Sequence, residues 1–100
     1  MPTPVTAESD LAPGDYYEDC AYHPCLCIRV LDDEVSGVSL VDGSCPRSCD
    51  IKHCGIRKLT LEEALHQKFY GPMDVELEDK NRWWRERDPT AWMYCPYRGA

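Results

Sequence analysis

The chain has 100 residues, including seven cysteines and three histidines, and a formal net charge of −7. This length allows one domain with a modest core, which a bound metal ion or a partner would help to stabilise. The acidic balance argues against non-specific binding to nucleic acid, because that affinity comes from Lys and Arg, and no stretch approaches the roughly 18 apolar residues of a membrane span.

The N-terminal residues 1–13 are predicted to form a flexible tail, because they contain three prolines and few large apolar side chains. Residues 14–100 are expected to form a single small domain. The N-terminus has no secretory-signal pattern, so we expect a cytoplasmic location. In a reducing compartment seven cysteines are poor candidates for structural disulfides.

Residues 14–59 are predicted to be β-structure. Four short segments have the alternation or the β-forming composition of strands: 26–31, 35–41, 48–52 and 56–59. Polar turn signals such as Asp42-Gly43 separate them. Short strands with tight turns predict a small bent β-meander or an SH3-like barrel.

A first helix is expected over about residues 61–70. Thr60 and Glu63 have the spacing of a capping box at its start. Apolar side chains recur at i, i+4 and i+8 and predict the face that packs on the sheet: Leu61, Leu65 and Phe69.

A second helix is expected over about residues 75–87, with acidic residues in its first turn and arginines in its last turn. Asp88-Pro89 would end it. The remaining residues are aromatic and irregular in pattern. The predicted fold class is therefore α+β, with the sheet followed by two helices and an aromatic C-terminal tail.

Two cysteine-rich segments, CAYHPCLC (20–27) and CPRSCDIKHC (45–54), suggest a structural zinc ion. Zinc takes four ligands, usually thiolate or imidazole, as two short-range pairs that the fold brings together. Both pairs lie at loop-like points of the sequence. The proposed ligands are Cys20, His23, Cys49 and Cys54.

Other assignments of these side chains remain open. His53, Cys25, Cys27 or Cys45 can each replace a proposed ligand. Alternatively, the thiols are small core residues, since cysteine is among the most buried residue types. Cys25 and Cys27 lie on one face of a predicted strand, as core residues would.

The C-terminal third is rich in the residue types that dominate protein–protein binding hot spots. The predicted partner-binding residues are Trp83, Trp84, Arg87, Trp92, Tyr94 and Tyr97. They favour a non-catalytic accessory or adaptor protein that docks on a larger protein partner. The partner and the oligomeric state are not determined by the sequence.

Two other functions are compatible with the composition. One is an acidic inhibitor that mimics nucleic acid, which needs carboxylates regularly spaced on one face. The other is a metal- or thiol-dependent enzyme subunit, which needs an open coordination position or a thiolate of low pKa. No motif is specific enough to identify a family.

Overall fold

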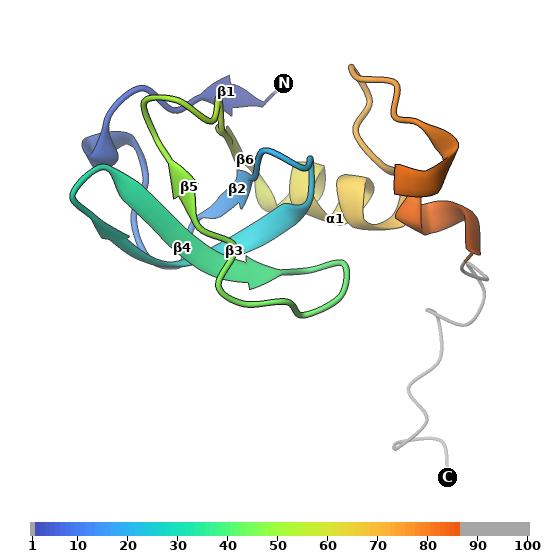
Figure 1. The fold of residues 1–100 in the computed structure, drawn as a ribbon, viewed down its shortest axis with the longest axis horizontal. Coiled ribbons are helices and arrows are strands. Elements are labelled where there is room, and N and C mark those ends of the chain that lie inside the picture. Colours follow the sequence, from blue (N-terminus) through green and yellow to red (C-terminus); the bar gives the residue numbers. More distant parts are fainter. Residues whose placement is uncertain (1, 87–100) are drawn as a thin grey trace, which may run out of the picture.

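The computed structural model describes residues 2–86 and is an antiparallel sheet with one α-helix (Figure 1). The strands are β1 (Thr3–Pro4), β2 (Tyr16–Glu18), β3 (Pro24–Leu31), β4 (Glu34–Ser39), β5 (Cys49–Asp50) and β6 (Arg57–Leu59). The helix is α1 (Leu61–Tyr70), and the 3-10 segments are η1 (Glu8–Asp10), η2 (Asp79–Asn81) and η3 (Trp83–Glu86). Within the described residues, no helix has the length and apolar character needed to cross a membrane.

The strand order is β1-β6-β2-β3-β4-β5, which corrects the prediction of a meander or SH3-like barrel over residues 14–59. Strands β2 to β5 do follow one another, but β6 returns to pair with β2, with Tyr16 opposite Leu59. The chain reverses after only two residues of β5, at a turn that ends on Gly55 with a positive φ of 69°. The sheet is open, with β1 and β5 at its edges.

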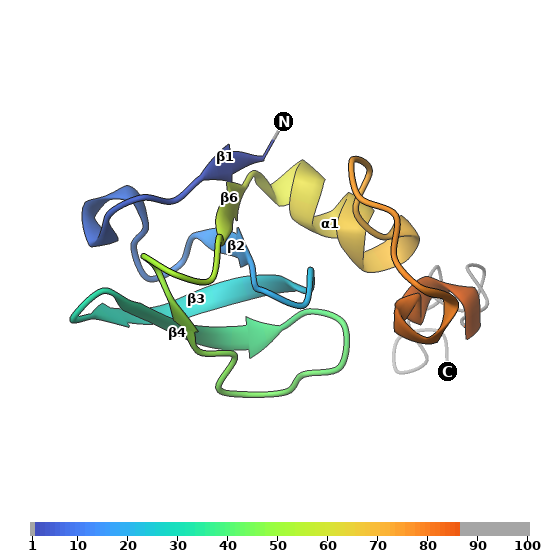
Figure 2. The same cartoon turned by 45° about the horizontal axis from the view of Figure 1, so that its top comes forward.

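The sheet curls around one hydrophobic core (Figure 2). The same buried cluster contains Val5, which follows the edge strand β1, and Cys49, which lies in the other edge strand, β5. The sheet must therefore be strongly curved to bring its two edges to one core. Its members are Val5, Leu11, Tyr17, Cys25, Cys27, Val35, Cys49, Ile51 and Ile56.

The predicted flexible tail is part of this core. β1 pairs with β6, the backbone N–H of Val5 donates to the Ile56 carbonyl at 3.0 Å, and Val5 and Leu11 are each only 4% exposed. Although the segment has few apolar residues, Val5 and Leu11 both belong to the buried cluster. The expectation for residues 1–13 overlooked this backbone pairing, which composition does not show.

The helix predicted over residues 61–70 is present, and its capping box is formed. The Glu63 N–H donates to Thr60 Oγ1 at 3.1 Å, and the Thr60 N–H donates to Glu63 Oε1 at 2.8 Å. The buried face, however, differs from the predicted one. Ala64 and Gln67 are buried, whereas Leu61 is 53% exposed.

The prediction of a second helix over about residues 75–87 is wrong. Within the described residues this stretch contains only η2 and η3. Leu77 is its one buried apolar residue before Trp83, so an α-helix would have no continuous face to bury. The chain instead folds back on the C-terminal end of α1, where the Trp83 indole N–H lies 3.1 Å from the carbonyls of Gln67 and Lys68.

Candidate metal centre

Cys20 lies in the turn between β2 and β3, and the Asp19 side chain shapes that turn. Asp19 Oδ1 accepts hydrogen bonds from the backbone N–H groups of Ala21 and His23, both at 2.9 Å. Its Oδ2 accepts from Arg47 Nε at 2.7 Å, although Asp19 is only 4% exposed. The Cys20 side chain is exposed.

Cys49 and Cys54 come from β5 and from the turn that follows it. Asp50 organises this turn: its carbonyl accepts from the Cys54 N–H at 2.9 Å, and its Oδ1 accepts from the Lys52 N–H at 2.9 Å. This geometry turns the C-x4-C segment back on itself. Cys49 is buried and Cys54 is half-buried.

The fold brings these three thiols together, with the Sγ atoms of Cys20, Cys49 and Cys54 all within 4.8 Å of one another. A metal ion with four thiolates at about 2.3 Å places its sulfurs about 3.8 Å apart. Small side-chain movements therefore suffice to close the three sulfurs around one ion.

The surroundings of Cys49 favour its neutral thiol when no metal ion is bound. Burial raises the pKa of its thiol to about 12, while the backbone N–H of Cys20 donates to its sulfur and partly offsets that rise. An N–H donor stabilises a thiolate, the form that binds metal. Zinc or another soft divalent ion would displace the thiol proton on binding.

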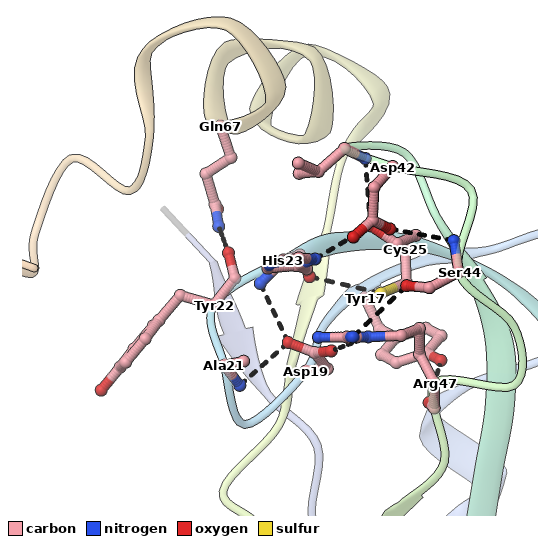
Figure 3. Close-up of polar contacts among 12 residues, drawn as sticks. Tyr17, Asp19, Ala21, Tyr22, His23, Cys25, Asp42, Ser44, Arg47 and Gln67 are labelled. Carbon is pink, nitrogen blue, oxygen red and sulfur yellow. Dashed lines mark hydrogen bonds and ion pairs between the residues drawn. The ribbon is translucent and has the colours of Figure 1, made fainter. Parts of the chain in front are cut away.

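His23, the fourth ligand proposed from the sequence, lies elsewhere. Its Nδ1 is 2.9 Å from Ser39 Oγ, and its ring packs edge-on against Trp83 with 4.8 Å between the centroids. Figure 3 shows its imidazole between the Asp19 turn and the loop that carries Asp42. Burial and the nearby Arg47 lower the pKa of His23, which keeps the ring neutral.

The alternative ligands are also placed outside the cluster. Cys25 and Cys27 are buried in the core at 0% and 2% exposure, and burial raises the pKa of both thiols. Cys45 is exposed in the loop before β5. His53 is exposed and directs Nδ1 to Asp50 Oδ2 at 2.7 Å. None of these four joins the three-thiol group among the described residues.

Two of the predicted partner-binding residues are used inside the chain. Besides its contacts with α1 and His23, Trp83 packs on Trp84 with 5.1 Å between the ring centroids. The Trp84 ring lies so close to Gly71 that a Cβ atom there would overlap it. The other four lie outside the described residues: Arg87, Trp92, Tyr94 and Tyr97.

A buried ion-pair network, missed from the sequence, supports the turn that carries Cys20. Glu18, 2% exposed, makes two bonds with Arg57, at 2.7 and 2.8 Å, and accepts from Gln67 Nε2 at 2.9 Å. Arg57 also pairs with Asp74. Gln67 further donates to the Tyr22 carbonyl (Figure 3). Arg57 and Glu18 lie 39 positions apart in the sequence, so no local pattern predicts their pairing.

No protein-family model, curated protein or solved structure matches this chain.

Proposed function

We propose that this chain is a small non-catalytic accessory protein whose fold is fastened by one zinc ion bound to Cys20, Cys49 and Cys54. The observation that carries the proposal is the convergence of these sulfurs within 4.8 Å from two segments that are distant in sequence. Their donor chemistry suits zinc, because soft thiolates select Zn²⁺ or Cu(I) over harder ions. A cytoplasmic location, where thiols stay reduced, belongs to the same proposal.

A structural role fits the position of the three thiols. They link the β2–β3 turn to β5 and to the turn after it, where β5 itself has only two residues. So short a strand gives little stability of its own. A zinc ion at this point would hold the reversal of the chain that sends β6 back to β2.

The test is the metal content of protein purified without a histidine tag. We expect about one zinc per chain in the wild type, and a strong loss in Cys20→Ser and Cys54→Ser. Cys45→Ser is the matched control, because it removes an exposed thiol outside the cluster and should leave the zinc content unchanged. A wild-type content below about 0.2 zinc per chain would contradict the proposed zinc site.

The accessory role is the second part of the proposal. Trp and Tyr are frequent hot-spot residues, and Trp92 and Tyr94 are the ones to test, because Trp83 and Trp84 make contacts within the chain. Wild-type protein should co-elute with one partner protein at fixed stoichiometry, and Trp92→Ala/Tyr94→Ala should not. Equal co-elution of both proteins, or of neither, would contradict this role.

A further inference from the structure

The three-thiol centre offers one ligand fewer than a closed zinc site needs. Structural zinc sites have four protein ligands, whereas sites with three keep a fourth position for water or an external ligand. Among residues 2–86, the metal-binding group contains Cys20, Cys49 and Cys54 and no further His, Cys, Asp or Glu.

The two histidines of the cysteine-rich segments lie outside this group. His23 is held by Ser39 and Trp83. His53 directs Nδ1 to Asp50 and is otherwise exposed. Neither ring belongs to the group of ligand atoms that lie within 4.8 Å of one another, so each would have to move before it could reach the sulfurs.

The centre is accessible from outside the fold. Cys49 is buried, but Cys54 is half-buried and Cys20 is exposed. Cys20 also lines a cavity of about 630 Å³, together with Ala21, Tyr22, His23, Asp42 and Trp83. This volume is within the range of small-molecule sites. A small molecule seated in the cavity would therefore lie beside one of the metal ligands.

We propose that the fourth position of the Cys20–Cys49–Cys54 centre takes a small-molecule thiol from this cavity, with water at that position in its absence. The inference rests on the proposed metal site. A fourth thiolate matches the softness of the other three ligands and completes a four-sulfur zinc environment. The thiol loses its proton to solvent, its sulfur replaces the water on the metal, and no electrons are transferred.

Cobalt substitution tests this directly, because Co²⁺ reports its ligands through visible absorption. The metal-free protein is loaded with one Co²⁺ and titrated with 2-mercaptoethanol. We expect a saturable rise of about one third in sulfur-to-cobalt charge-transfer absorption, as three metal–sulfur bonds become four. A thioether of the same size, 2-(methylthio)ethanol, has no ionisable thiol and should leave the spectrum unchanged.

Two variants locate the external ligand. Ala21→Phe places a ring in the cavity, while the Ala21 contact with Asp19 uses only the backbone N–H. Cobalt binding should persist in this variant, with at least a tenfold weaker response to thiol. An unchanged thiol affinity would overturn the cavity as the seat of the ligand. Cys95→Ser tests whether the chain itself supplies a fourth sulfur.

The outcomes separate this inference from the proposed function. Absence of cobalt binding would defeat the metal site itself. Cobalt binding with a four-sulfur spectrum before any thiol is added, reduced in Cys95→Ser, would keep the metal site and overturn the external ligand. Cobalt binding with no thiol response, or loss of all cobalt bands on thiol addition, would overturn it too.

Discussion

At the scale of single residues, the adjacent acidic residues Glu18 and Asp19 are buried, although acidic side chains are usually exposed. Charged residues are rarely buried unless they are paired, and these two are 2% and 4% exposed. Each is paired with an arginine, Arg57 or Arg47. Removing one partner of a buried pair typically costs about 3–5 kcal/mol. Two carboxylates used in this way are unavailable to a surface that imitates nucleic acid.

His23 gives a prediction at the same scale. Burial and Arg47 lower its pKa, so between its lowered folded pKa and the unfolded value of 6.5 only the unfolded chain takes up the proton. The stability that the neutral ring supports is therefore present above pH 6.5 and is lost as the pH falls below it. We expect the free energy of unfolding to decrease from pH 7 to pH 5, and to decrease less in His23→Gln.

Urea denaturation across this pH range measures the difference between the two slopes, in which contributions common to both proteins cancel. Asp42 does not interfere, because hydrogen bonds from Ser44 lower its pKa to about 2 and it stays charged throughout. Parallel slopes for the two proteins would show that His23 does not titrate with folding.

At the scale of elements, the local sequence decides where α1 begins and ends, whereas packing decides which face of α1 is buried. The capping residues fix where the helix begins, and Gly71 with a φ of 82° follows its end. The i, i+4, i+8 apolar ridge suggested the wrong buried face. The helix turns Gln67 inward because Glu18 and the Tyr22 carbonyl need its amide donor, and Ala64 permits a close approach to the sheet.

The capping box predicts a measurable contribution to stability. Thr60→Ala removes the oxygen that accepts from the Glu63 N–H, and should lower the free energy of unfolding by about 1 kcal/mol. Thr60→Ser keeps the hydroxyl and should stay close to the wild type. Urea denaturation followed by far-UV circular dichroism gives both values, and a Thr60→Ala protein as stable as Thr60→Ser would contradict the role of the cap.

At the scale of the whole molecule, the metal centre would join parts of the chain that have little regular structure. Cys20 and Cys49 are separated by 28 other residues, and the loop before β5 runs from residue 40 to residue 48 without a strand. The three-thiol centre would therefore couple metal binding to folding of the entire sheet.

Metal removal should lower the melting temperature of the whole domain. Zinc at a free concentration 100-fold above its Kd stabilises the folded state by about 2.7 kcal/mol, which corresponds to about 15 °C for a domain of this size. Calorimetry with and without a strong chelator measures the shift. Cys45→Ser should show the same shift, and Cys54→Ser none. A wild-type protein that melts at one temperature in both conditions would rule out metal-linked folding.

The sequence by itself determined the features that depend on neighbours along the chain: strand-forming segments, the start and end of α1, and the two cysteine-rich segments that supply the thiols. Tertiary structure decided the return of β6 to β2, the inclusion of residues 3–11 in the core, the buried face of α1, and the replacement of a second helix by 3-10 turns. The physical reason is that backbone pairing between distant strands and the pairing of buried charges leave no periodic signal in the sequence. Residue type was enough to group Cys20 with Cys49 and Cys54 as candidate metal ligands. The contacts of His23 with Ser39 and Trp83 join residues that are distant in the sequence, so the sequence did not predict them.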